Sequence, residues 1–177
     1  MKKLCVFCGS SAGKNSIYLE EAKTLGRELT KNNMGLVYGG ASIGLMGAVA
    51  DAALENNGKA WGVIPQAIVD LEIIHTELTE CFVVNNMHDR KAKMYDLSDA
   101  FVALPGGMGT MDEFCEIVTW AQLKYHDKPC FVLNTTGYFD KYLEYVSHMN
   151  AEGFFSDEHM NLFKEVKSVD ELIEHLK

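Results

Sequence analysis

Residues 100–118 read AFVALPGGMGTMDEFCEIV, and this stretch decides the fold. Its first five residues, Ala100–Leu104, contain no polar side chain, which is typical of a strand covered on both faces. A glycine-rich turn follows at Pro105–Thr110, and apolar residues then recur at helical spacing. A buried strand, a tight turn and a helix make one β-α unit, and such units build parallel sheets.

The same alternation of apolar runs and amphipathic stretches extends along the whole chain. It predicts strands at Leu4–Cys8, Leu36–Tyr38, Ala60–Ile64, Cys81–Val84, Ala100–Leu104 and Cys130–Leu133. It predicts helices at Ile17–Asn32, Gly44–Asn56, Asp89–Leu97, Met111–Lys124, Phe139–Asn150 and Val169–Leu176. We therefore expect one α/β domain over residues 1–177, with a doubly wound, mostly parallel sheet and helices on both faces. Gln66–Thr79 has weak signals and is predicted to be a loop with a short helical piece near the ligand.

Composition excludes several classes of protein. The net charge of −9 disfavours nucleic-acid binding, which depends on basic side chains that neutralise phosphates. No apolar run is long enough to span a membrane, and Gly and Ser follow the N-terminus too soon for a signal-peptide core, so we expect a cytoplasmic protein. The five cysteines are expected to be reduced, and Cys5 and Cys8 to be strand residues rather than a zinc or redox pair.

Three glycine-rich turns follow predicted strands, where ligands collect in open α/β sheets. Gly9–Gly13 is one residue too short for a P-loop, so ATP or GTP hydrolysis is not expected. Gly39–Gly44 lacks the order of a dinucleotide-binding fingerprint, and it serves either tight packing or ligand contact. Pro105–Thr110 offers several main-chain N–H groups at a positive helix end, which suits a phosphate.

Charged residues lie close to this turn and on one other helix. Glu113 lies within a turn of the phosphate-binding segment and is the favoured catalytic carboxylate, whereas Asp112 and Glu116 fit a role as complements to the helix dipole. The segment Met87–Lys93 places Arg90 and Lys91 at a helix start, where they either bind an anion or form a solvated basic face.

The chain resembles the LOG ("lonely guy") family of cytokinin riboside 5′-monophosphate phosphoribohydrolases. The family pattern P-G-G-x-G-T-x-x-E appears at Pro105–Glu113, and M-H-x-R-K appears at Met87–Lys91. The resemblance implies a Rossmann-like fold, a homodimer, and no cofactor or metal. It also implies that Arg90 and Glu113 are catalytic, and that the substrate contacts Glu72, Arg90, Lys91, Gly107, Met108, Gly109, Thr110, Met111, Asp112, Glu113 and Thr119. Plant members usually carry Tyr at the position of Met108, so the resemblance predicts the chemistry better than the base preference.

The expected reaction is hydrolysis of the base–ribose bond of cytokinin riboside 5′-monophosphates, AMP or both. Glu113 would stabilise the positive charge that develops on the ribose, and Arg90 would bind the phosphate or keep Glu113 ionised. Glu72 either hydrogen-bonds the substrate or is a surface charge. A non-catalytic nucleotide sensor remains the alternative. Family members are often labelled lysine decarboxylases, but a chain this short is not expected to be a pyridoxal-phosphate enzyme.

Overall fold

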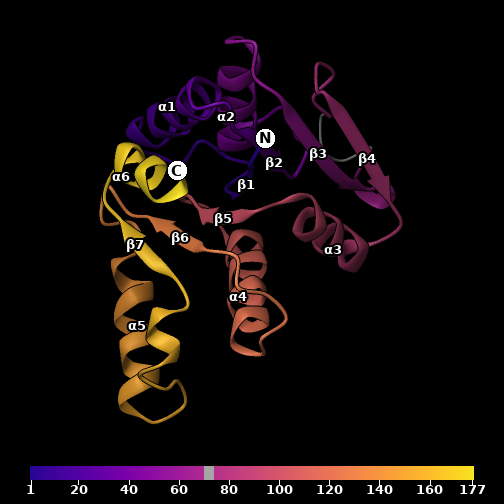
Figure 1. Ribbon diagram of the computed structural model, residues 1–177. Coiled ribbons are helices and arrows are strands. Elements are labelled where there is room, and N and C mark those ends of the chain that lie inside the picture. Colours follow the sequence, from indigo (N-terminus) through magenta and orange to yellow (C-terminus); the bar gives the residue numbers. More distant parts are fainter. Residues whose placement is uncertain (70–73) are drawn as a thin grey trace.

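A computed structural model describes residues 1–69 and 74–177, and its strands form one parallel sheet. The sheet has seven strands in the order β4-β3-β2-β1-β5-β6-β7 (Figure 1). The strands are β1 (Lys3–Phe7), β2 (Gly35–Tyr38), β3 (Ala60–Pro65), β4 (Glu80–Val84), β5 (Ala100–Ala103), β6 (Cys130–Leu133) and β7 (Lys164–Val166). The order reverses between β1 and β5, as in Rossmann-like folds, which confirms the predicted doubly wound class.

Helices cover both faces of this sheet. They are α1 (Ile17–Lys31), α2 (Gly44–Leu54), α3 (Met87–Leu97), α4 (Met108–Gln122), α5 (Asp140–Ala151) and α6 (Val169–Leu176). Short 3-10 turns lie at Gln66–Ile68 and His159–Asn161. Alternate residues of β1 enter two separate cores: Leu4 and Val6 pack with α1, α2 and α6, whereas Cys5 and Phe7 pack on the side of α3 and α4. Both faces are buried, which explains why the strand sequences show no polar alternation.

Strand β7 was not predicted. It has only three residues, Lys164–Val166, and two of them are charged. It lies at one end of the sheet and pairs only with β6 among the described strands. An edge strand needs little apolar surface, so its sequence carries no strong strand pattern.

Two helices begin earlier than predicted, at Met108 instead of Met111 and at Met87 instead of Asp89. The side chain of Asn86 accepts a hydrogen bond from the N–H of Asp89 and caps α3. In α4 the extended residue Gly107 is the N-cap, so Gly109 and Thr110 belong to the first helical turn. The short helical piece predicted within 66–79 corresponds to Gln66–Ile68.

Two further expectations can be compared with the structure. All five cysteines are free thiols, as predicted. Among the described residues, the helices are too short or too polar to cross a lipid bilayer.

Helices α1 and α2 approach each other closely at Gly26. A Cβ atom at this position would lie 2.4 Å from the carbonyl oxygen of Val49. We expect Gly26→Ala to lower the free energy of unfolding by about 1–3 kcal/mol, because the added methyl group overpacks this contact. Urea denaturation measures the effect, with Lys23→Ala on an exposed position of α1 as the control. Equal midpoints for the two variants would contradict the packing argument.

Candidate functional site

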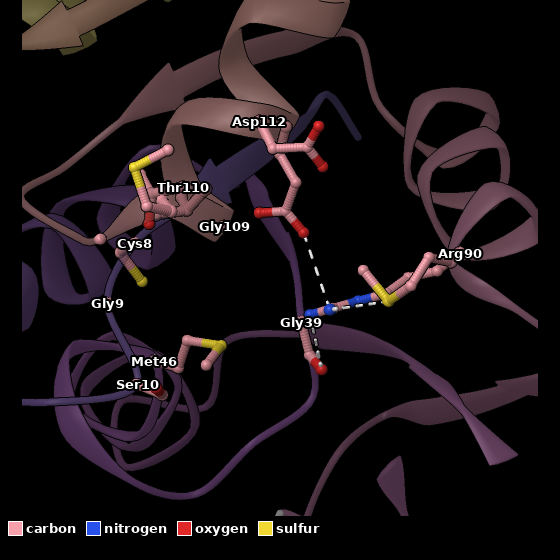
Figure 2. Close-up of a pocket in the computed structure, with 14 residues that line it drawn as sticks. Cys8, Gly9, Ser10, Gly39, Met46, Arg90, Gly109, Thr110 and Asp112 are labelled. Carbon is pink, nitrogen blue, oxygen red and sulfur yellow. Dashed lines mark hydrogen bonds and ion pairs between the residues drawn. The ribbon is translucent and has the colours of Figure 1, made fainter. Parts of the chain in front are cut away.

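A cavity of about 320 Å³ lies beyond the carboxyl ends of β1, β2 and β5 (Figure 2). We call it the central cavity. Its described lining residues are Val6, Cys8, Gly9, Ser10, Gly39, Met46, Met87, Arg90, Gly107, Met108, Gly109, Thr110, Asp112 and Glu113. The cavity therefore lies at the reversal of strand order, where doubly wound sheets bind ligands.

The N-terminus of α4 forms one wall of the central cavity. The N–H groups of the first helical turn have no carbonyl partner within the helix, and no side chain of residues 1–69 or 74–177 caps this end by a hydrogen bond. A Cβ atom at Gly107 or Gly109 would meet no described protein atom within 4 Å. Packing against the described part of the chain therefore does not require these two glycines. Their main-chain N–H groups and the positive end of the helix dipole suit a bound anion such as a phosphate.

Arg90 is only 7% exposed and is fixed by main-chain carbonyl groups. Its Nε donates to the carbonyl oxygen of Val63 at 3.1 Å, and its Nη2 lies 3.4 Å from that of Gly39. Both acceptors stand near the carboxyl ends of strands β3 and β2. The capped start of α3 brings Arg90 to them, so the guanidinium is held before any ligand binds.

Glu113 lies opposite Arg90, three residues after Thr110 on α4. Its side chain is nearly buried, and its Oε1 is 3.8 Å from Nη1 of Arg90. At this distance the two side chains form an ion pair but not a direct hydrogen bond. The cavity thus contains a carboxylate, a cation held by main-chain carbonyls, and a helix N-terminus whose free N–H groups suit an anion.

Cys8 also lines the central cavity, and its thiol is a candidate nucleophile by residue type. Burial raises the pKa of its thiol well above the ordinary value, and the negative charge of Glu113 raises it further, against a smaller opposing effect of Arg90. The reactive form of cysteine is the thiolate. Cys8 therefore stays protonated at neutral pH and is a wall residue.

Three residues suggested by the family resemblance do not line the central cavity. Lys91 joins α3 to α4, because its Nζ lies 3.2 Å from Oδ2 of Asp112 and 3.0 Å from Oε1 of Glu116. Burial acts to lower the pKa of Lys91, but these two carboxylates raise it overall, so the side chain is charged. Met111 packs against the core on the α4 side, and Thr119 is exposed and donates to the carbonyl of Cys115. Glu72 lies outside the described residues.

Several cavity residues were not among the predicted substrate contacts. Gly9, Ser10 and Gly39 belong to the first two glycine-rich turns, which the rule that ligands collect after strands marks as candidate segments without naming single contacts. Met46 and Met87 carry no such signal, because thioether side chains are also common in cores. Together with Met108, which is 85% exposed, they give the cavity three flexible apolar walls. The described residues include no group of three or more His, Cys, Asp and Glu side chains placed to hold a metal ion.

The sequence is similar to one protein family and to several characterised proteins. A family model described as "Possible lysine decarboxylase" matches residues 46–176. The chain is 43% identical to the cytokinin riboside 5′-monophosphate phosphoribohydrolase LOG5 of Arabidopsis thaliana, over 99% of this chain and 77% of that protein. It is 46% identical to the cytokinin riboside 5′-monophosphate phosphoribohydrolase of Rhodococcoides fascians, over 88% of this chain and 79% of that protein.

Solved structures share the fold at lower identity. The Moco carrier protein of Chlamydomonas reinhardtii superposes with a TM-score of 0.73 at 21% identity, covering 99% of this chain and 94% of that one. The molybdenum cofactor binding protein of Rippkaea orientalis gives a TM-score of 0.74 at 19% identity, covering 99% and 96%. At these identities the likeness establishes the fold alone.

Gly109 can be substituted to test whether the N-terminus of α4 binds an anion, because the space beside it is open among the described residues. We expect Gly109→Ala to weaken the binding of AMP by about tenfold, because the added methyl group occupies the space of the anion and costs one hydrogen bond to a charged group. The melting temperature should stay equal or rise, because alanine favours a helix more than glycine does. Calorimetric titration and a thermal melt measure the two effects. An unchanged affinity for AMP would remove this helix end from the site.

Proposed function

The chain belongs to the LOG family of cytokinin riboside 5′-monophosphate phosphoribohydrolases, and from this premise we propose which bond it breaks and with which residues. The protein hydrolyses the N-glycosidic bond of cytokinin riboside 5′-monophosphates, AMP or both, and releases the free base and ribose 5-phosphate. The observation that carries this proposal is the buried pair of Arg90 and Glu113, which faces the same cavity as the open N-terminus of α4.

The phosphate of the substrate binds at the first turn of α4. Its negative charge is stabilised by the helix dipole and by the N–H groups of residues 107–110. Glu113 follows Thr110 by three residues, which is a rise of about 4.5 Å along the helix axis. A ribose attached to the bound phosphate can therefore reach the Glu113 carboxylate. Binding energy from the phosphate positions the reacting carbon, C1′.

The carboxylate of Glu113 supplies the chemistry. When the bond between C1′ and the base nitrogen breaks, its electron pair leaves with the base and positive charge develops on the ribose. Glu113 stabilises that charge and accepts a proton from the water whose oxygen bonds to C1′. The departing base takes one proton from solvent, and Glu113 later releases its proton to solvent, so that the ribose gains OH and the base gains H. Arg90 favours the ionised form of Glu113. Because Nε and Nη2 of Arg90 already donate to main-chain carbonyls, its contact with Glu113 supports this role over direct phosphate binding.

The remaining substrate contacts are proposed by family membership. Asp112 and Met108 line the central cavity and stand close enough to meet a nucleotide. Lys91 is paired with Asp112 and Glu116, which supports a role in orienting α4 in this chain. A direct contact with Glu72, Met111 or Thr119 stays a prediction.

Other functions fit the cavity less well. A pyridoxal-phosphate decarboxylase would need a lysine for the Schiff base, and the described lining residues include none. A nucleotide sensor would use the helix end but has no need of a buried carboxylate opposite a fixed arginine. A cytoplasmic location is part of our proposal, since free thiols persist in reducing compartments.

The substrate assay separates the proposed functions directly. Purified protein is incubated with isopentenyladenosine monophosphate, AMP and lysine in separate reactions, and products are resolved by chromatography. We expect free base and ribose 5-phosphate from at least one nucleotide and no carbon dioxide from lysine. Binding of both nucleotides without release of base would favour the sensor.

Replacement of the Glu113 carboxylate by an amide tests how much its negative charge contributes to the rate. We expect Glu113→Gln to lower the rate of base release by about a hundred- to a thousandfold, because the side chain keeps its shape but loses the charge that stabilises the transition state. The matched control is Glu116→Gln on the same helix. The Glu116 carboxylate pairs with Lys91, and Glu116 is not among the described residues that line the central cavity. The control should retain most of the rate. A folded Glu113→Gln variant with a wild-type rate would rule out the assignment.

We also propose a homodimer. Phe114, Ile117 and Val118 of α4 are buried within the chain, so these residues do not require a second copy. Large apolar side chains remain exposed just after the end of α4, namely Leu123 (57%) and Tyr125 (71%). Their exposure supports association through this side of the molecule.

Light scattering tests the dimer. At micromolar concentrations we expect a mass twice that of the 19.7 kDa chain, and a lower mass for the double variant Leu123→Ser with Tyr125→Ser. The loss of apolar surface weakens association. A wild-type mass equal to one chain across this concentration range would contradict the proposal.

A further inference from the structure

The turn before α4 receives a hydrogen bond from a residue that lies outside the central cavity. Oη of Tyr138, in the segment between β6 and α5, lies 2.5 Å from the carbonyl oxygen of Gly106 and donates to it. The Gly106 carbonyl and the Gly107 N–H belong to one planar trans peptide group and point in opposite directions. A donor that fixes the carbonyl therefore also fixes the direction of the Gly107 N–H.

A second cavity lies on the Tyr138 side of this turn. It has a volume of about 130 Å³, and Gly106, Tyr18 and Tyr138 are among its lining residues. Gly9 and Gly107 line both cavities, so the turn is the wall between them. The peptide group between Gly106 and Gly107 thus has its carbonyl held from the side of the second cavity, and its N–H points the opposite way, away from Tyr138.

The two glycines of this peptide group are held to different degrees. Gly106 is closely packed, because a Cβ atom there would lie 2.0 Å from Oγ1 of Thr110 and 2.9 Å from the nitrogen of Gly9. A Cβ atom at Gly107 would meet no described atom within 4 Å, so packing does not restrain that side of the peptide group, and glycine has the greatest main-chain freedom of all residues. The neighbouring carbonyl of Pro105 accepts a hydrogen bond from the N–H of Gly9 at 3.1 Å, which fixes the start of the turn. The hydroxyl of Tyr138 fixes the next carbonyl along the chain.

Tyr138 is itself held in place although its side chain is partly exposed. The buried residue Asn134 accepts a hydrogen bond from the N–H of Phe139 at 2.8 Å and donates one to Oδ1 of Asp140 at 2.8 Å. Phe139 is buried, so the residue next to Tyr138 is anchored in the core. The ring of Tyr138 also packs edge-on against Tyr18, with centroids 5.7 Å apart. The hydroxyl therefore meets Gly106 from a defined direction.

We propose that Tyr138 is a positioning residue for phosphate binding: its hydroxyl orients the Gly106–Gly107 peptide group so that the Gly107 N–H points at the phosphate. This inference rests on the proposed function and names a residue that acts through the main chain without touching the substrate. A purely structural role for the same hydrogen bond would stabilise the fold and leave the affinity of the folded protein for phosphate unchanged.

Tyr138→Phe tests the proposal, because it removes only the hydroxyl and keeps the ring against Tyr18. Inorganic phosphate and ribose 5-phosphate are titrated as inhibitors of AMP hydrolysis, and their direct binding is measured by calorimetry. We expect both dissociation constants, and the KM for AMP, to rise by about three- to tenfold, as for the loss of one aligned hydrogen bond to a charged group. The control is Tyr145→Phe, the same change at an exposed position of α5, which should alter none of them.

The outcomes distinguish the inference from the proposed function. If Tyr138→Phe lowers the melting temperature but binds inorganic phosphate as the wild type does, Tyr138 is merely structural and the inference is wrong. If the variant loses phosphate affinity while the wild type releases no base from any nucleotide, the inference stands and the hydrolase assignment fails. If the wild type hydrolyses AMP and both tyrosine variants match it in KM and phosphate affinity, the function stands and the inference fails.

Discussion

The burial of the Arg90 guanidinium is the constraint on which the site depends. A buried cation is costly unless carbonyl or carboxylate oxygens surround it, and here the ends of β2 and β3 supply two carbonyls. Gly39 makes this possible, because a Cβ atom there would lie 2.2 Å from Nη2 of Arg90. The two strands and α3 are thereby fixed relative to one another. The remaining nitrogen, Nη1, faces Glu113. The two carbonyl contacts that stabilise the buried guanidinium therefore also orient it toward the Glu113 carboxylate.

The helix end and the ion pair divide the work of the proposed reaction between them. The first turn of α4 offers main-chain N–H groups and a dipole, which suit a phosphate but cannot stabilise a developing positive charge. Glu113 carries the opposite sign and lies further along the same helix, so one element presents both a positive end and a negative side chain. The geometry fits the proposed substrate class, a nucleoside monophosphate, because a phosphate bound at the helix end would place the ribose beside the carboxylate.

The apolar runs of the sequence predicted the central strands well, because AFVA and CFVL are buried on both faces and need no polar residues. The edge strand Lys164–Val166 escaped prediction, since its place depends on pairing with β6 rather than on its own composition.

For the site, the family pattern indicated Arg90 and Glu113, and the structure brings their side chains together. The family pattern could not show that Lys91 pairs with Asp112 and Glu116, because these contacts depend on how α3 and α4 pack. Likewise, nothing local to Tyr138 indicates that it reaches Gly106.

In the proposed mechanism, helix α4 both binds the phosphate and carries the catalytic carboxylate. A crystal structure of the Glu113→Gln variant with bound AMP tests this arrangement most directly. We expect phosphate oxygens within hydrogen-bond distance of the N–H groups of residues 107–110, with C1′ of the ribose beside the side chain of residue 113 and facing Arg90. A phosphate bound elsewhere in the cavity, or a ribose turned away from residue 113, would contradict it.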